Sequence, residues 1–242
     1  MVKVNDIQKL KELIDKSKKI VFFGGAGVST ESGIPDFRSA QGLYQEKGLI
    51  TPEEIISHDY FFYDTKGFYK FYKEKMIYLD ALPNDAHKAL ATLEKMGKLT
   101  AVITQNIDNL HQLAGSKNVI ELHGSVYRNY CLKCKTFYNI DFIMNSEIPI
   151  CKCGGIVKPD VTLYGEQLAP GVLERAIKYI DEADLFIIGG TSLSVYPAAN
   201  LIYYYRKDKP LVLINRDLTG KESLATLFIQ GSIGSIFKQL AI

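Results

Sequence analysis

Four cysteines stand close together in the second half of the chain, and thiolates are ligands that zinc prefers in small structural sites. They form two pairs, Cys131 with Cys134 and Cys151 with Cys153, separated by residues 135–150. Two close pairs at this separation are typical of a zinc ribbon, although the second pair is spaced more tightly than usual. Two disulfides or free thiols are the alternatives, and we favour one structural zinc because a reduced compartment disfavours disulfides. Four thiolates leave the ion no open position for catalysis.

His123 is the histidine best placed for acid–base chemistry. It follows the apolar run 119–122 and directly precedes the cysteine-containing segment. An imidazole titrates near neutral pH and can act as a general base, yet a structural role fits the sequence equally well at this point. The other histidines, His58, His87 and His111, fall in predicted helices, where packing or capping is the default expectation.

A glycine-rich segment, Gly25 to Thr30, follows the first apolar stretch of the chain. Glycines at such a turn let the backbone approach a pyrophosphate, and the N-terminus of a following helix offers it unpaired N–H groups. Thr30 stands where the G-x-G-x-x-G pattern has its third glycine. A phosphate-binding loop and a plain tight turn are therefore equally compatible with this segment alone.

Three further polar segments favour a ligand site. Residues 32–39 hold Asp36 and Arg38, which taken alone predict a salt bridge that fixes a loop. Residues 105–108 and 190–193 each stand directly after an apolar run. Polar residues at the carboxyl ends of parallel strands meet in one crevice, which is where open α/β sheets bind ligands. The sequence therefore predicts a binding crevice built from these segments.

The elements that position these residues alternate between strands and helices. Short, continuously apolar runs predict strands buried on both faces, and they cover 20–23, 99–104, 184–188 and 210–215. Helical spacing of apolar residues is found in 5–19, with Asn5 or Asp6 as the N-cap, and segments 86–96 and 172–180 are also helix-like. Strands that alternate with helices predict an α/β fold with a Rossmann-like parallel sheet.

Two insertions interrupt this alternation. Residues 42–82 are rich in Tyr and Phe and contain Thr51-Pro52-Glu53-Glu54, a capping box with proline at the first helical position. Residues 127–158 carry the cysteines among short polar segments. We therefore expect a single domain over 1–242, whose Rossmann-like part comprises 1–41, 83–126 and 159–242. The helical insert 42–82 and the zinc ribbon 127–158 form its smaller lobe.

Composition and charge exclude several classes of protein. The 242 residues are 47% hydrophobic and 23% charged, as is ordinary for a globular protein. The 29 basic and 27 acidic residues leave a net charge of +2, without the concentrated basic stripe of a nucleic-acid-binding module. The apolar runs are all shorter than the roughly 18 residues needed to span a bilayer, so no membrane-spanning segment is predicted. The N-terminal segment is too charged for a signal peptide. We therefore expect a cytoplasmic protein without nucleic-acid or membrane partners.

Taken together, the motifs resemble the sirtuin family of NAD-dependent protein deacylases. The resemblance runs from Gly25 to the last strand and rests on segments 25–30, 33–39, 104–108, 123–124, 164–166, 190–193 and 214–215, together with the four cysteines. Such a number of motifs in one order is specific. It favours His123 as a catalytic base over a structural histidine.

The resemblance implies that NAD occupies the crevice and is consumed. The implied diphosphate and nicotinamide-ribose contacts are Ala26, Thr30, Phe37, Arg38 and Gln105. The implied carboxamide pocket consists of Ile34, Asn106, Ile107 and Asp108, and the implied adenosine contacts are Thr191, Ser192, Asn215 and Arg216. Gly25, Gly27, Asp36, His123 and Gly190 complete the implied cofactor-binding set.

The resemblance also implies the reaction, deacetylation of a protein lysine. The acyl oxygen of acyl-lysine attacks the anomeric carbon of the nicotinamide ribose, and nicotinamide leaves as a product and candidate inhibitor. His123 then removes a proton from a ribose hydroxyl, while Asn106 and Asp108 orient the reactants, so that lysine and acyl-ADP-ribose are released. Mono-ADP-ribosyl transfer and a non-catalytic NAD sensor are the alternatives, and a hydride-transferring dehydrogenase is disfavoured.

The implied partner is an acyl-lysine protein or peptide, which enters as an extended strand between the lobes. The implied contacts are Val161, Thr162, Leu163, Tyr164, Gly165 and Val195. Glu166 is expected to fix this loop rather than touch the substrate. Tyr72 and Lys75 resemble the Tyr and Arg pair of relatives that prefer acidic acyl groups, but lysine lacks the bidentate fork of arginine, so we expect Tyr72 to pack in the lobe.

Overall fold

The larger part of the molecule is a parallel sheet of six strands. The computed structural model describes residues 4–37, 42 and 50–241. The order of the strands is β3-β2-β1-β7-β8-β9, with every pairing parallel. Their bounds are β1 Ile20–Gly24, β2 Leu99–Thr104, β3 Val119–Glu121, β7 Leu185–Gly189, β8 Leu211–Asn215 and β9 Leu227–Gln230. The α/β parallel-sheet prediction is confirmed.

Two hydrophobic cores lie on opposite faces of this sheet. All five residues of β1 are buried, and they alternate between the cores, with Phe22 in one and Phe23 in the other. The first core is closed by helices α1 Val4–Lys16, α5 Asp85–Lys95 and α9 Ile233–Gln239, and the second by α8 Val172–Glu182 and the 3₁₀ segment η4 Ala198–Tyr204. Burial on both faces explains why these strands read as continuous apolar runs.

The chain reverses its direction of winding next to β1. The strand pairs with β2 on one side and with β7 on the other, and the chain after β1 leads to α5 on one face of the sheet, whereas the chain after β7 leads to η4 on the opposite face. Such a switch point opens a crevice at the carboxyl ends of the strands. The loop after β1 forms two 3₁₀ turns, η1 Ala26–Val28 and η2 Thr30–Ser32. These turns stand in place of the α-helix that the dinucleotide-type pattern predicted directly after the glycines.

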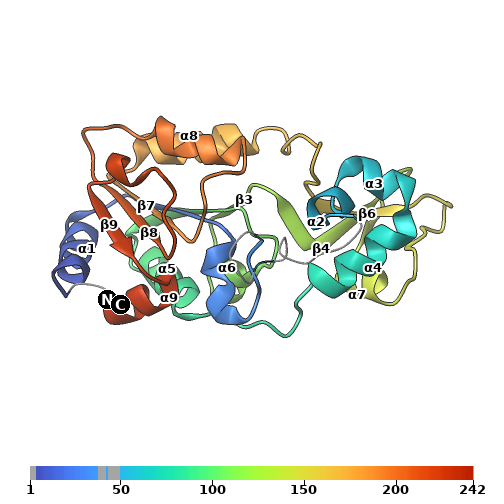
Figure 1. The fold of residues 1–242 in the computed structure, drawn as a ribbon, viewed down its shortest axis with the longest axis horizontal. Helices are drawn as coiled ribbons and strands as arrows, with labels where there is room; N and C mark the ends of the chain where they lie inside the picture. Colours follow the sequence, from blue (N-terminus) through green and yellow to red (C-terminus); the bar gives the residue numbers. More distant parts are fainter. Residues whose placement is uncertain (1–3, 38–41, 43–49, 242) are drawn as a thin grey trace.

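The smaller lobe lies at the other end of the molecule (Figure 1). It contains an antiparallel sheet in the order β5-β4-β6, with β4 Gly124–Cys131, β5 Phe137–Tyr138 and β6 Val157–Val161. Helices α2 Pro52–Ile55, α3 His58–Tyr63, α4 Thr65–Lys75 and α7 Ile140–Met144 complete the lobe. A third hydrophobic core joins the helical insert to the sheet and includes Phe61, Phe68, Val126 and Val161.

The expected lobe boundaries fall inside strands. Positions 126/127 and 158/159 divide β4 and β6, whose residues Val126 and Val161 belong to the core of the smaller lobe. The structure thus places both strands in that lobe as whole elements.

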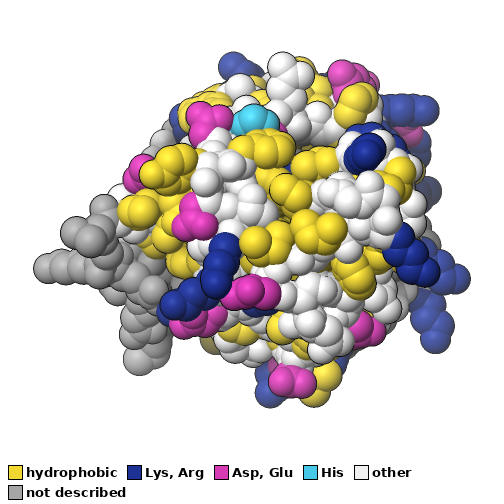
Figure 2. All heavy atoms as spheres, turned by 90° about the vertical axis from the view of Figure 1, so that its right-hand side faces the viewer, with side chains coloured by type: hydrophobic (Ala, Val, Ile, Leu, Met, Phe, Trp, Pro, Cys, Tyr) yellow, Lys and Arg dark blue, Asp and Glu magenta, His cyan; other side chains and the backbone are white. Residues whose placement is uncertain are grey.

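Acidic and basic side chains are interspersed with hydrophobic ones on the outer face of the lobe (Figure 2).

Local details of the first helices differ from prediction in one case and agree in another. Helix α1 already includes Asn5 and Asp6, so neither is its N-cap, and it ends at Lys16. It stops short of residue 19 because the N–H groups of Lys18 and Lys19 bond to the Asp184 carboxylate. At α2, the Thr51 side chain accepts from the Glu54 N–H and Pro52 is the first helical residue, as the sequence predicted.

None of the helices in the described part of the chain is long and apolar enough to cross a membrane.

Candidate active site

A cleft of about 430 Å³ opens at the carboxyl ends of β1, β2, β7 and β8 and extends to the smaller lobe. The structure brings the sequence-predicted residues together around it. Those lining the cleft are Gly25, Ala26, Gly27, Thr30, Ile34, Asp36, Phe37, Gln105, Asn106, Ile107, Asp108, His123, Val161, Thr162, Leu163, Tyr164, Gly165, Gly190, Thr191, Ser192, Val195, Asn215 and Arg216. Arg38 lies outside the described residues.

His123 sits where the chain passes from the large sheet into the smaller lobe, between β3 and β4. Its Nδ1 is 3.0 Å from the carbonyl oxygen of Gln105. Because a carbonyl only accepts, Nδ1 carries the hydrogen, and the neutral ring keeps a lone pair on Nε2. Burial lowers the pKa of His123, and the bond to Gln105 partly offsets this. The ring is therefore held as a neutral base on the wall of the cleft.

Asp108, Asn106 and Ser29 form a hydrogen-bonded group beside this histidine. Ser29 Oγ donates to Asp108 Oδ2 at 2.6 Å, Leu110 N–H donates to Asp108 Oδ1 at 2.9 Å, and Asn106 Nδ2 donates to Ser29 Oγ at 3.0 Å. Burial raises the pKa of Asp108, whereas the bonds from Ser29 and Leu110 lower it. Both carboxylate oxygens accept a hydrogen bond, which favours the ionised form.

Ser29 is the member of this group that we did not predict as a site residue. It is buried and lies in the glycine-rich segment that was singled out for its backbone alone. Its partners follow about eighty positions later in the chain, at 106 and 108. The only available signal was a hydroxyl inside a motif that faces the predicted crevice.

Glycines 25, 27 and 190 allow two loops to pack against each other. Gly27 N–H donates to Gly190 O at 2.8 Å, and a Cβ on Gly27 would lie 2.8 Å from the Gly190 Cα. Gly190 has a φ of 60°, and a Cβ there would meet the Val28 nitrogen at 2.5 Å. A side chain at either position would separate the loops. The close approach thus explains the glycines by packing between loops, whatever ligand the loops hold.

The same loop offers free donors to an anion. The backbone N–H groups of Ala26 and Thr30 have no hydrogen-bond partner among the described residues, and both residues line the cleft. Gln105 Nε2 donates to Thr191 Oγ1 at 2.9 Å and ties this end of the cleft to the loop after β7. Arg216 also lines the cleft, where its guanidinium lies 3.5 Å from the carboxylates of both Asp36 and Asp217. A dinucleotide diphosphate fits the free backbone donors of the loop.

Residues 161–165 form the wall of the cleft on the side of the smaller lobe. Thr162 N–H donates to the His123 carbonyl at 3.0 Å, so this wall is tied directly to the histidine. Tyr164 bonds through both backbone groups to the helical insert, accepting from His58 N–H at 2.8 Å and donating to Ile56 O at 3.1 Å. Within the described part of the chain, the N–H and C=O of Gly165 have no partner. They remain available for an added strand.

Tyr72 and Lys75 also line the cleft. Tyr72 is fully buried in the core of the smaller lobe, where its ring stacks on that of Phe68 at a centroid separation of 5.4 Å. This agrees with the expectation that Tyr72 packs in the lobe. Its hydroxyl nevertheless has no hydrogen-bond partner among the described residues, and burial raises its pKa. The tyrosine thus packs in the core of the lobe and also forms part of the cleft lining.

The remaining histidines lie elsewhere. His87 on α5 and His111 on α6 Leu110–Leu113 are buried beside each other, with ring centroids 4.7 Å apart, and neither lines the cleft. His58 opens α3 and pairs with Asp59 at 3.0 Å. These positions agree with the packing and capping roles expected for them.

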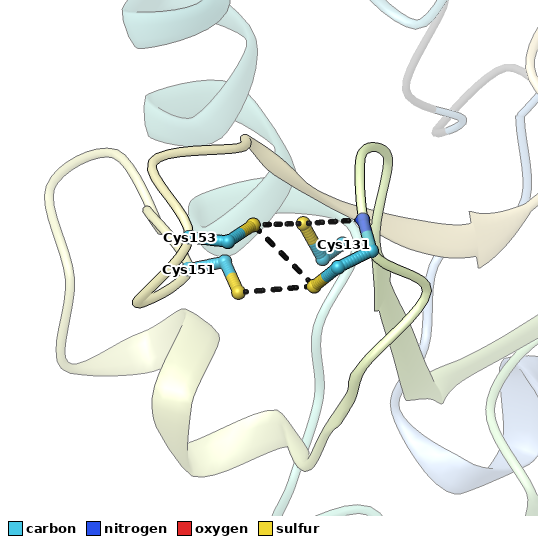
Figure 3. A group of neighbouring side chains, drawn as sticks. Cys131, Cys151 and Cys153 are labelled. Carbon is cyan, nitrogen blue, oxygen red and sulfur yellow. Dashed lines mark hydrogen bonds between the residues drawn. The ribbon is translucent and has the colours of Figure 1, made fainter.

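The four cysteines come together in the smaller lobe. Their sulfur atoms all lie within 4.8 Å of one another, and the thiols of Cys131, Cys151 and Cys153 point toward a common centre (Figure 3). The Cys131–Cys153 and Cys134–Cys151 sulfur separations are 3.5 Å. Tetrahedral zinc with Zn–S bonds of about 2.3 Å requires sulfur separations of about 3.8 Å, whereas a disulfide requires about 2.0 Å. The geometry fits one structural zinc better than two disulfides, and none of the four cysteines forms a disulfide in the structure.

The motifs and this site are those of one known family. The Sir2 family model matches residues 25–197, which include the glycine-rich loop, His123 and the cysteines. The chain belongs to the Sir2 family. The sirtuin resemblance predicted from the motifs is therefore confirmed.

Relatives of this Sir2-family chain match it over nearly its whole length. A protein of Clostridium perfringens named NAD-dependent protein deacetylase is 62% identical over 234 residues, which cover 95% of this chain and 96% of the relative. A protein of the same name from Clostridium acetobutylicum is 53% identical, covering 98% and 99% of the two chains.

Solved Sir2 structures have the same fold. A Sir2 complex with a p53 peptide and NAD+ has a TM-score of 0.86 and 38% identity, covering 97% of this chain and 96% of that one. Sir2Tm bound to a propionylated peptide has a TM-score of 0.87 and 37% identity, with the same coverage.

Proposed function

We propose that this chain is an NAD-dependent protein lysine deacetylase that transfers the acyl group of acyl-lysine to ADP-ribose and releases nicotinamide. The observation that carries the proposal is the fixed His123 ring, whose Nδ1–H is held by Gln105 O in a cleft of about 430 Å³. Relatives up to 62% identical bear the name NAD-dependent protein deacetylase. When bound, NAD supplies the activated ribose and the leaving nicotinamide.

The chain's residues position the reactants and move one proton. N–H groups at Ala26 and Thr30, unpaired among the described residues, support binding of the diphosphate, and the position of Arg216 on the cleft lining supports a contact with the adenosine half. The hydrogen bonds that join Asn106 and Asp108 to Ser29 support their role in orienting the ribose and the carboxamide. His123 Nε2 accepts a proton from a ribose hydroxyl, because its Nδ1 is already protonated and its lowered pKa keeps the ring neutral.

The peptide is proposed to bind as an extended strand along 161–165, opposite Val195. Gly165 offers an N–H and a C=O, and Tyr164 is held in place by the helical insert. Added strands gain affinity from such free backbone groups and specificity from neighbouring pockets.

The zinc ion is proposed to stabilise the smaller lobe without taking part in the reaction. Cys131, Cys134, Cys151 and Cys153 supply four thiolates, and a fourfold thiolate site is closed to substrate. Free cysteines gathered as a ligand set also favour the reduced cytoplasm as the compartment.

The test is mass spectrometry of matched acetyl-lysine and succinyl-lysine peptides, incubated with and without NAD. Loss of the acetyl group only with NAD, with an equal amount of nicotinamide, is the expected result, and His123→Ala should abolish it. Faster removal of succinyl would assign the acyl pocket to Tyr72 and Lys75. Nicotinamide release from an unchanged peptide, or no nicotinamide at all, would contradict the deacetylase proposal.

A further inference from the structure

A largely buried ion pair lies under the wall proposed to receive the peptide. Lys158 on β6 and Glu166 beyond the wall meet with Nζ and Oε2 3.0 Å apart, and their side chains are only 14% and 20% exposed. Charges removed from water in this way contribute little net stability, so the pair needs another explanation.

Both members of the pair bind the backbone of the intervening segment. Lys158 Nζ donates to the carbonyls of Val161 at 3.1 Å and Pro159 at 3.4 Å. Glu166 Oε2 accepts from the Leu163 N–H at 2.9 Å, and Glu166 N–H donates back to Leu163 O at 3.0 Å. One carboxylate oxygen therefore joins the lysine to the middle of the segment. This brace fixes residues 161–163, with Glu166 lining the cleft and Lys158 outside its lining.

The brace determines which backbone groups face the cleft. The N–H of Thr162 donates to His123, both backbone groups of Tyr164 bond to the helical insert, and both backbone groups of Leu163 bond to Glu166. Among the described residues, the groups left for an incoming strand are the C=O of Thr162 and the N–H and C=O of Gly165, next to Glu166. A strand adds to such an edge only if the free groups are held in register, because ordering them on binding costs affinity.

We propose that Lys158 and Glu166 are positioning residues for the acyl-lysine peptide, acting through the backbone of 161–165. The inference rests on the proposed deacetylase function for the identity of the ligand. It assigns the pair an effect on peptide binding that leaves NAD binding unchanged, since in the described part of the chain neither side chain makes a hydrogen bond or ion pair with the loops after β1, β7 or β8.

The experiment compares three variants with the wild-type protein. Lys158→Met removes the charge and the donors, and Lys158→Arg keeps both. Lys98→Met is the matched control, because Lys98 Nζ also makes three hydrogen bonds, all to backbone carbonyls, at Ile14, Asp15 and Ser17, but braces α1 away from the cleft. Peptide affinity is measured by fluorescence anisotropy of a labelled acetyl-lysine peptide, and KM for NAD by nicotinamide release.

Lys158→Met should weaken peptide binding about tenfold, the scale of one lost charge-assisted hydrogen bond, with KM for NAD unchanged. Lys158→Arg should bind like the wild type, and Lys98→Met should lower the melting temperature without affecting the peptide. Unchanged peptide affinity in folded Lys158→Met, a parallel rise in KM for NAD, or an equal loss in Lys98→Met would each overturn the proposal. If the wild type binds peptide but releases no nicotinamide, the deacetylase function fails, while the affinities still decide the role of the pair.

Discussion

Replacing Ser29 with alanine is expected to impair catalysis through Asp108. The substitution removes the 2.6 Å bond from Ser29 Oγ to the carboxylate and deprives Asn106 Nδ2 of its 3.0 Å acceptor. A hydrogen bond to a charged group contributes about 1.5–3 kcal/mol, which corresponds to a fall of roughly 10- to 100-fold in kcat/KM. The hydroxyl also lowers the pKa of Asp108 against the effect of burial, so its loss raises that pKa further.

The pH dependence distinguishes this effect from simple destabilisation. A carboxylate with a raised pKa is protonated at higher pH, so the acidic limb of the rate profile should move toward neutrality in Ser29→Ala. The assay is the initial rate of nicotinamide release at saturating peptide, across acidic and neutral pH. Ser17→Ala is the control, because the Ser17 hydroxyl makes one similar bond, 2.7 Å to Leu13 O, far from the cleft. A Ser29→Ala profile that superimposes on that of the wild type would refute the reasoning.

Three further predictions follow from the same structure. Cys151→Ser should lose bound zinc and the fold of the smaller lobe, as measured by metal analysis and circular dichroism, since structural zinc supplies folding free energy. Burial lowers the pKa of His87 to about 4, so the unfolded chain takes up a proton first as the pH falls below about 6.5. The free energy of unfolding should therefore fall by about 3 kcal/mol between about pH 6.5 and about pH 4, and it should fall less in His87→Gln. Urea unfolding at several pH values measures both. Gly124→Ala places a Cβ 1.8 Å from Asp160 O at a φ of 79°. It should lower the free energy of unfolding by at least about 2 kcal/mol more than Gly220→Ala does in the same assay, because a Cβ on Gly220 meets nothing within 4 Å.

The parallel sheet was predictable because burial on two faces leaves a simple pattern. Strands β1, β2, β7 and β8 appear in the sequence as apolar runs between polar loops, within a residue of their observed bounds. Strand β9, Leu227–Gln230, was not predicted, because only three of its four residues are apolar and such a short run does not stand out as a strand. Helix α9 was also missed, because its seven residues amount to only about two turns of helical periodicity.

The antiparallel sheet of the smaller lobe gave a weaker pattern. Strand β6 reads Val-Lys-Pro-Asp-Val, so that buried and half-buried residues alternate and a proline interrupts it. Strand β4 begins at Gly124 with a φ of 79° and contains an irregular register between Ser125 and Asn129. Proline, glycine and bulges all lower the strand propensity that a sequence displays. The lobe was therefore expected from its cysteines and aromatic residues rather than from its strands.

At the site, the motifs indicated which residues converge but not how they bond. The described members of the predicted set line one cleft, while their individual roles stay predictions. The protonation of His123 depends on the Gln105 carbonyl, and the brace of Lys158 depends on Glu166 across a turn. Such contacts join backbone groups to side chains, and backbone groups leave no mark in the residue types of a sequence.

The two bonds of His123 connect it to both halves of the molecule. Its ring holds the Gln105 carbonyl at the end of β2, while its own carbonyl holds Thr162 beside the end of β6. His123 thus couples the end of β2 in the large sheet to the wall that the smaller lobe supplies. The bond that orients the ring toward the cleft is also the bond that fixes its tautomer, so position and protonation of this side chain are set by one contact.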